Sequence, residues 1–183
     1  MRRLVWIGVL LIGGTLSALA AVGTGYTLFG DATYVSPGNN SNRAVQLISN
    51  ANTGVFSGID LAVQANLTIN ALNELSTDYK FTAASCALGS PRFGITLASN
   101  PNAAIFVYIG PPPNYTGCPP NVWANTGNLL TPASLVDATQ YGGTFYETWA
   151  AVQAQFSGLR RLRIFGQRDK LKADRSKGRE TWA

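Results

Sequence analysis

Short apolar stretches separated by polar, turn-forming segments run through most of the chain. Three of them, at 45–47, 59–63 and 93–97, alternate apolar residues with polar or small ones. A period of two is typical of strands that turn one face toward a core. The stretch 104–109 has no polar position, so it predicts a central strand covered on both faces. Three prolines at 111–113 end it, because proline has no amide hydrogen to continue a ladder.

These strands predict a mainly all-β fold, a single antiparallel β-sandwich for which a jelly roll is one possible arrangement. A short helix is predicted at 147–156, where Trp149, Val152 and Phe156 have helical spacing and Gly158 is placed to end the helix. The apolar positions of 67–75 also fit one face of a short helix, although the polar residues between them have low helix propensity.

The first 21 residues have the layout of a secretory signal peptide. Two arginines precede the apolar stretch 4–16, and Ala18-Leu19-Ala20 matches the small-residue cleavage pattern. We expect an N-terminal signal helix, cleavage after Ala20 or Ala21, and a secreted protein that is extracellular or periplasmic. The alternative is a retained membrane anchor, since the uncharged run 4–21 is just long enough to cross a bilayer.

The chain has two cysteines, Cys86 and Cys118, and no histidine. In an oxidising compartment two cysteines have one possible pairing, so export predicts a disulfide between them. Neither has a CxxC partner or an imidazole to activate it, which favours a structural bond over a redox role. The absence of histidine also excludes Ser-His-Asp and Cys-His nucleophiles and most zinc sites, and we expect no metal and no cofactor.

The net charge of +5 is concentrated at the two ends of the chain. From Arg160 onward there are nine Lys or Arg against three Asp or Glu, whereas the body of the chain is acidic. The basic pI therefore does not indicate a fold that binds nucleic acid. We predict a sandwich domain over 22–158 and a basic, disordered tail over 159–183, for which a shift in reading frame is the alternative origin.

Several ordered motifs between residues 43 and 157 resemble those of a group of secreted bacterial proteins of uncharacterised function. The motifs are LSTDY at 75–79, Cys86 followed by GSPRF at 89–93, YIGP at 108–111, TGC at 116–118, TGNL at 126–129 and GGTFY at 142–146. The resemblance implies export and a β-sandwich, without an activity. The turn 98–103 lacks the carboxylates that such proteins carry at a possible calcium site, and a basic stretch stands where they continue into further hydrophobic strands.

Loop aromatics are the candidate ligand-binding residues. Tyr115 lies in a proline-rich loop and Trp123 in an asparagine-rich one, where exposed rings can stack on sugars. Tyr108 and Trp149 lie in apolar settings that favour the core. We therefore predict a non-catalytic extracellular or cell-surface protein that binds a glycan or cell-wall polymer through Tyr115 and Trp123. Contact with a membrane is expected only through an uncleaved signal segment.

Two other functions remain open at this point. An extracellular polysaccharide hydrolase or lyase would need a pair of carboxylates, and Asp78 and Asp137 are the residues to test. The body has only six acidic residues, scattered along the chain, so catalytic residues are not predicted. The third possibility is adhesion of the basic tail to anionic surfaces. Arg92, at the start of a strand, is expected to pair with a carboxylate of the body.

Overall fold

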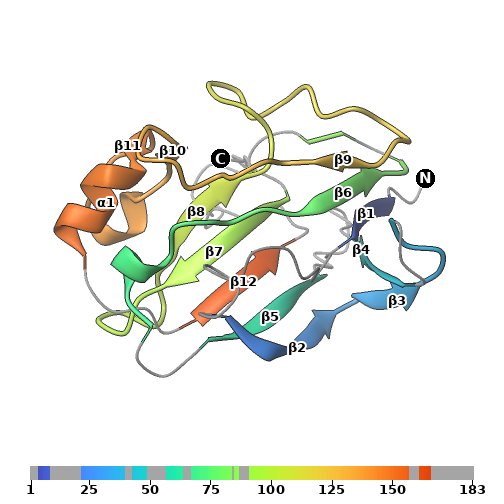
Figure 1. Cartoon of the computed structure of the whole chain (residues 1–183), viewed down its shortest axis with the longest axis horizontal. Helices are drawn as coiled ribbons and strands as arrows, with labels where there is room; N and C mark the ends of the chain where they lie inside the picture. The colour runs from blue at the N-terminus through green and yellow to red at the C-terminus, as the bar shows by residue number, and fades with distance from the viewer. Residues whose placement is uncertain are drawn as a thin grey trace, which may run out of the picture.

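The computed structural model describes most of the chain. The described residues are 4–8, 22–39, 43–48, 57–63, 67–83, 85–86, 91–156 and 161–165, with only the backbone described for 4–8, 22–24 and 161–165. Within them the protein is mainly β, with two five-stranded sheets, one two-stranded sheet, one α-helix and two single-turn 3₁₀ helices (Figure 1). Neighbouring strands in all three sheets are antiparallel. The mainly β class is confirmed, and the single sandwich stays a prediction.

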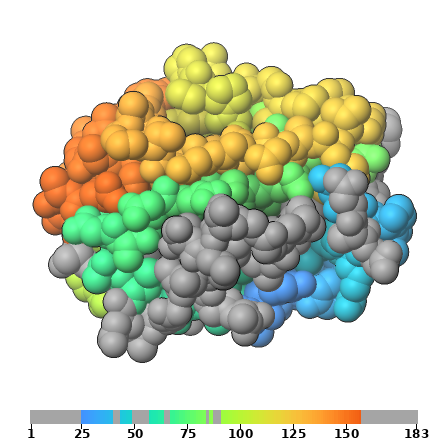
Figure 2. All heavy atoms as spheres, viewed as in Figure 1, coloured from blue at the N-terminus to red at the C-terminus, as the bar shows by residue number. Residues whose placement is uncertain are grey.

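The first sheet has the order β3-β4-β1-β6-β9. Its strands are β1 (Leu4–Gly8), β3 (Thr33–Val35), β4 (Ala44–Ile48), β6 (Asp78–Phe81) and β9 (Ala124–Asn125). The pairing of β9 with β6 continues as hydrogen bonds between flanking segments, from Thr126 N to Thr77 O at 3.0 Å and from Leu129 N to Leu75 O at 2.9 Å. The chain that follows β9 therefore lies along the segment that precedes β6, and Figure 2 shows the two as a yellow strip beside a green one.

The second sheet has the order β2-β5-β12-β7-β8. Its strands are β2 (Val22–Gly30), β5 (Ser57–Val63), β7 (Arg92–Thr96), β8 (Ile105–Tyr108) and β12 (Arg161–Phe165). A two-stranded sheet is formed by β10 (Leu135–Val136) and β11 (Glu147–Thr148). It lies beside β8, at the end of the molecule that carries the helix (Figure 1).

The two five-stranded sheets contribute side chains to one hydrophobic core. Among its most buried members are Leu47 of β4, Phe81 of β6, Ile59 of β5, Phe93 and Ile95 of β7, and Ile105 of β8. Four of these residues, Leu47, Ile59, Phe93 and Ile95, come from the alternating stretches at 45–47, 59–63 and 93–97, so the strands predicted there are confirmed. Burial of large apolar side chains is the main stabilising contribution in such a fold.

Strand β8 corrects one prediction in part. Its four residues are buried on both faces, as the apolar stretch predicts, but β8 lies at the edge of its sheet and not at the centre. Its outer edge is covered by a bridge in which Phe106 and Asp137 exchange two backbone hydrogen bonds of 2.9 Å. An apolar strand covered by a short neighbouring segment has the same sequence pattern as a central strand, which explains the error.

The predicted C-terminal helix is confirmed as α1 (Trp149–Gln155). Thr148 caps its start by accepting a hydrogen bond from Ala151 N at 3.2 Å, and Trp149 and Val152 face the core. Gly158, predicted to end the helix, lies outside the described residues. The 67–75 stretch is not an α-helix, since only the 3₁₀ turn η1 (Ile69–Ala71) forms in it, in keeping with its low helix propensity. A second 3₁₀ turn, η2, spans Thr139–Tyr141.

The two ends of the described chain form strands. Leu4–Gly8 form β1 between β4 and β6, residues 9–21 lie outside the described residues, and the signal segment stays a prediction. Arg161–Phe165, predicted to belong to a disordered tail, form β12 between β5 and β7. The alternation of Leu162 and Ile164 with arginines fits a strand, and the register sets Leu162 opposite Leu61. Residues 166–183 lie outside the described residues.

Candidate aromatic surface site

The outward face of the β7–β8 hairpin carries a second, smaller cluster of buried residues. Cross-strand register places Arg92 opposite Tyr108 on this face, while Phe93 and Val107 meet on the other face, in the main core. The outward cluster contains Ala104, Phe106, Tyr108 and Tyr115. Side chains that alternate along one strand therefore serve two separate environments.

Four rings extend this cluster to the surface, and we call them the aromatic cluster: Tyr108, Tyr115, Phe145 and Tyr146. The ring centroids of Tyr108 and Tyr115 are 4.2 Å apart, and Phe145 lies 5.8 Å from Tyr108 and 5.9 Å from Tyr115. Tyr146 stacks on Tyr115 at 6.2 Å with an interplanar angle of 21°. Phe145 and Tyr146 meet edge to face at 4.8 Å. These distances are those at which aromatic pairs attract.

The aromatic cluster has a buried base and an exposed top. Tyr108 and Tyr115 are 5% and 4% exposed, whereas Phe145 and Tyr146 are 38% and 46% exposed. The base fixes the rings above it, because a buried ring held by neighbours on several sides has little rotamer freedom left. The top presents two perpendicular rings to solvent.

The loop that carries Tyr115 is held by close backbone contacts. Tyr115 N donates to Pro111 O at 2.9 Å, and the Tyr146 hydroxyl donates to Pro113 O at 2.8 Å. A Cβ on Gly110 would lie 2.5 Å from the Tyr115 carbonyl, so glycine is required there. Tyr115 itself has a φ of 51°, in the left-handed region that non-glycine residues seldom adopt. Contacts on both sides of the loop thus define where its ring stands.

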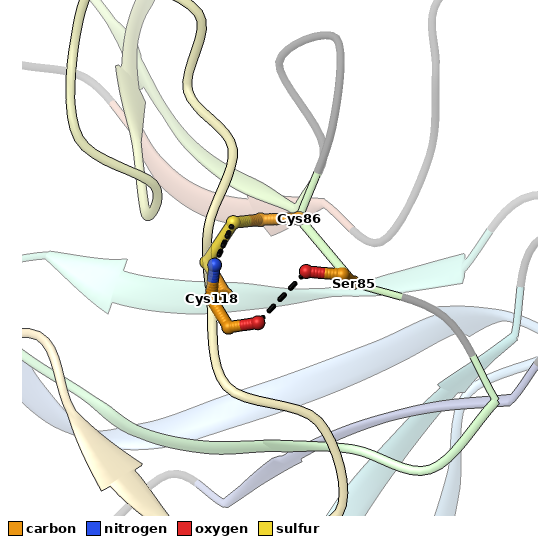
Figure 3. The surroundings of a disulfide bond; sticks show 3 residues. All are labelled: Ser85, Cys86 and Cys118. Carbon is orange, nitrogen blue, oxygen red and sulfur yellow. Dashed lines mark hydrogen bonds between the residues drawn. A yellow bond between two sulfur atoms is a disulfide. The ribbon is translucent and has the colours of Figure 1, made fainter.

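The predicted disulfide is confirmed and anchors the same loop. Cys86 and Cys118 are bonded, with both residues buried. Figure 3 shows two further bonds at this point: Cys118 N donates to Cys86 Sγ at 3.0 Å, and the Ser85 hydroxyl donates to Cys118 O at 2.8 Å. Because Cys86 Sγ would also lie 2.9 Å from a Cβ on Gly110, the disulfide packs directly beneath the turn that leads to Tyr115.

A buried carboxylate supports the base of the aromatic cluster. Asp137, 7% exposed, accepts the Tyr108 hydroxyl at 2.8 Å, and its other oxygen accepts both the backbone N–H and the hydroxyl of Thr139, at 3.0 and 2.6 Å. Burial raises the pKa of Tyr108, and the negative charge of Asp137 and their hydrogen bond raise it further. Arg92 lies over the Phe106 ring, with its guanidinium carbon 3.9 Å from the centroid, and its charge opposes the rise.

The hydroxyl of Tyr115 has no hydrogen-bond partner among the described residues, although it is buried. Burial raises the pKa of Tyr115 to about 12, and the neighbouring Tyr146 and Asp137 act in the same direction. The ring therefore stays neutral throughout the physiological pH range. Its contribution to the aromatic cluster is one of packing.

The residues predicted for ligand binding are not brought together. Tyr115 is buried and not exposed, because the rings of Phe145 and Tyr146 cover it. Trp123 is half-buried next to β9 and makes no ring contact with the aromatic cluster in the part of the chain that is described. Tyr108 and Trp149 are buried, as predicted. The exposed members of the aromatic cluster, Phe145 and Tyr146, follow the Gly142-Gly143-Thr144 turn and are not among the residues predicted to bind a ligand.

The two carboxylates considered for catalysis are separately engaged. Asp78 is buried and accepts the Asn125 side-chain amide at 2.7 Å, whereas Asp137 is held by Tyr108 and Thr139. The described residues hold no group of three or more Asp, Glu or Cys that could bind a metal ion. Each carboxylate has a structural partner, and nothing in this geometry pairs the two for acid–base chemistry.

Comparison with known protein families, with curated proteins and with solved structures finds no match. The resemblance stated from the motif series stays a prediction. In the part of the chain that the structure describes, no helix is long and apolar enough to cross a membrane.

Proposed function

We propose that this protein is a secreted, non-catalytic extracellular or cell-surface protein that binds a glycan through its aromatic cluster. The observation that carries the proposal is the pair of exposed rings, Phe145 and Tyr146, standing on a buried aromatic base. Contiguous exposed apolar surface often marks a binding site, and here two exposed rings adjoin each other. The proposal includes the jelly-roll-like sandwich, supported by two antiparallel sheets that share one core.

The chemistry of the site fits a carbohydrate. The faces of a pyranose ring expose C–H groups, which pack on the electron-rich faces of aromatic rings, while sugar hydroxyls need neighbouring hydrogen-bond groups. The Tyr146 hydroxyl donates its proton to Pro113 O, so its oxygen keeps the capacity to accept a hydrogen bond from a sugar hydroxyl. The rings are preorganised by their contacts, so binding requires little ordering of side chains.

A glycan array followed by titration of the best ligand tests this function. We expect Tyr146→Ala to weaken binding about tenfold or more, equivalent to ~1.4 kcal/mol, with the fold unchanged. Tyr34→Ala is the matched control, because Tyr34 is exposed to the same extent, 46%, but lies on β3 away from the aromatic cluster. A folded protein with no hit on the array, or equal losses in the two variants, would contradict the proposal.

Trp123 remains a ligand-binding candidate predicted from the sequence, and the variant Trp123→Ala distinguishes its contribution from that of the aromatic cluster. If Trp123→Ala abolishes binding and Tyr146→Ala does not, the ligand contacts the β9 side of the molecule instead. Binding that depends on both would indicate an extended ligand, since no ring contact joins the two places. The hydrolase or lyase reading gains support only if Asp78→Asn or Asp137→Asn removes turnover of a polysaccharide while the fold is kept.

A further inference from the structure

The buried base of the aromatic cluster contains one hydrogen-bonding group that the fold does not use. Tyr115 is 4% exposed, and its hydroxyl has no hydrogen-bond partner among the described residues. The neighbouring hydroxyl of Tyr108, a residue that is 5% exposed, donates to Asp137 at 2.8 Å. A buried hydroxyl without a partner has lost its hydrogen bonds to water and gained none in return. Stability of the free protein therefore does not account for this group, since a phenylalanine would pack the same ring without that cost.

The backbone also holds Tyr115 in an unfavourable conformation. Its φ of 51° lies in the left-handed region, which is costly for a residue that carries a Cβ. The loop imposes this conformation, because Tyr115 N donates to Pro111 O at 2.9 Å and the Tyr115 carbonyl lies close against Gly110. Residues held in such sparsely populated conformations cluster at functional sites. Two unfavourable features, one of the backbone and one of the side chain, thus meet at Tyr115.

The Tyr115 hydroxyl lies near other polar groups of the aromatic cluster. Burial is the main cause of the raised pKa of Tyr115, and Tyr146 and Asp137 raise it further, so both groups are close to the hydroxyl. The ring of Tyr146 is stacked on that of Tyr115, with the centroids 6.2 Å apart. The exposed rings therefore lie over a base that contains hydrogen-bonding groups.

Phe145 is the ring of the aromatic cluster that can uncover Tyr115. It is 38% exposed and packs edge to face on Tyr115, with the centroids 5.9 Å apart. Turning it aside breaks no hydrogen bond of its side chain, whereas moving Tyr146 would break the bond from its hydroxyl to Pro113 O. Solvent-exposed side chains change rotamer within nanoseconds. A ligand can thus gain access to the Tyr115 hydroxyl while the other rings stay in place.

We propose that Tyr115 is a specificity-determining residue of the glycan site. When Phe145 turns aside, the Tyr115 hydroxyl forms a hydrogen bond with one hydroxyl group of a sugar whose ring packs on Tyr146. A site that bonds a substrate hydroxyl rejects the analogue that lacks it, because the buried group of the protein is then left unpaired. The site therefore distinguishes a sugar from its deoxy analogue at one ring position. This inference rests on the proposed function.

Titration with simple sugars tests the hydrogen bond. The probes are the methyl glycosides of glucose, galactose, mannose and N-acetylglucosamine, followed by the monodeoxy derivatives of the one that binds best. Tyr115→Phe keeps the ring and should bind that sugar about tenfold more weakly than the parent does. One monodeoxy derivative should lose about the same factor on the parent, and should bind Tyr115→Phe as well as it binds the parent. Tyr34→Phe, which removes a hydroxyl from an exposed tyrosine of β3, is the matched control and should bind like the parent.

Nuclear Overhauser contacts between the rings test the movement of Phe145. The rings of Phe145 and Tyr115 are in contact in the free protein. This contact should disappear when the best-binding methyl glycoside saturates the site, whereas the contact between Tyr146 and Tyr115 should persist. If Tyr115 served packing alone, both contacts would remain.

Three results would overturn the inference. One is equal affinity of the parent and Tyr115→Phe in a protein that loses binding through Tyr146→Ala. Another is a contact between Phe145 and Tyr115 that survives saturation. The third is a folded parent that binds a glycan on the array but none of the four methyl glycosides. Each of these leaves the proposed function standing, whereas a folded parent with no hit on the array contradicts that function as well, so the two failures are distinguishable.

Discussion

The two faces of strand β8 make a comparison within a single element. Ile105 and Val107 enter the main core, whose members are mostly aliphatic and aromatic. Phe106 and Tyr108, on the opposite face, meet Arg92 and Asp137 and belong to the outward cluster. The two inward side chains are 0% and 2% exposed, whereas the outward cluster adjoins the half-exposed rings of Phe145 and Tyr146.

This difference shows how one strand contributes to the core on one face and to the proposed binding surface on the other. The hydrophobic effect is non-directional, so burial of aliphatic side chains stabilises the fold without fixing the orientation of individual polar groups. The outward face uses groups with directional requirements, since a buried tyrosine hydroxyl needs an acceptor and a buried carboxylate needs donors. Satisfying those groups also fixes the rings in the orientation that the surface presents.

Replacing a core ring should give the largest effect and would test whether the inward face carries the stability. Phe93 is 1% exposed, and Phe93→Ala should lower the free energy of unfolding by about 3–5 kcal/mol, because the cavity cannot fill. Phe145→Ala removes the same ring from the exposed top and should cost only about 1 kcal/mol. Urea unfolding measures both. Similar losses would show that the two faces are not distinct in stability.

Removing the disulfide should come next. The Cys86→Ser, Cys118→Ser double variant frees a loop that spans a sequence separation of 32, worth about 3–4 kcal/mol in the chain-entropy model. Because the bond packs beneath Gly110, we also expect weaker glycan binding through a displaced Tyr115. Thermal unfolding and ligand titration give the two quantities. Unchanged ligand affinity in the folded double variant would separate the disulfide from the aromatic cluster.

Tyr108→Phe should have a smaller effect and addresses the outward face alone. The ring remains, but one oxygen of buried Asp137 loses the hydroxyl that it accepts at 2.8 Å. An acceptor left without its donor costs about 1–3 kcal/mol. Asp137→Ala also removes the two hydrogen bonds from Thr139, so it should still destabilise the Tyr108→Phe variant, but by less than it destabilises the parent, and a double-mutant cycle measures this coupling. Additive losses would contradict a direct interaction.

Alkaline pH should give the smallest change. An unfolded tyrosine titrates near 10, whereas the pKa of Tyr115 is raised to about 12, so its contribution to stability is complete below pH 10. Between about pH 10 and 12 the unfolded chain releases the proton and the folded one keeps it, and stability falls. Denaturant unfolding from pH 9 to 12 should show a shallower fall in Tyr115→Phe than in the parent.

Measurement of the Tyr115→Phe variant at pH 7 is the control for this experiment, because Tyr115 is neutral there in both the folded and the unfolded chain. The Tyr115 hydroxyl has no described partner, so its removal should leave stability unchanged or slightly increased. A clear loss at pH 7 would mean that this hydroxyl makes an interaction that matters.

Much of the strand pattern was predictable from the sequence, because alternation reports directly on burial. The stretches 45–47, 59–63 and 93–97 became β4, β5 and β7, and helical spacing identified α1. The disulfide followed from having only two cysteines and a predicted export. What alternation does not report is the position of a strand in its sheet, which is why β8 was placed at the centre.

The site was harder to predict, because exposure of a loop residue depends on what packs over it. Tyr115 sits in a proline-rich loop, yet Phe145 and Tyr146, some thirty positions later in the sequence, cover its ring. Likewise β12 lies in a stretch rich in arginine, where charge suggested disorder. This strand forms because β12 pairs with both β5 and β7. Amino-acid composition carries no information about such tertiary pairing.

The bridge between Phe106 and Asp137 has a consequence for engineering. An unprotected edge such as that of β8 would invite copies of the protein to associate through their backbones. The segment that prevents this contains Asp137 and continues directly into the turn that presents Phe145 and Tyr146. Substitutions made in that turn to change specificity can therefore disturb the segment that covers the edge of β8. Libraries of variants should begin after Asp137, so that the covered edge and the solubility of the protein are retained.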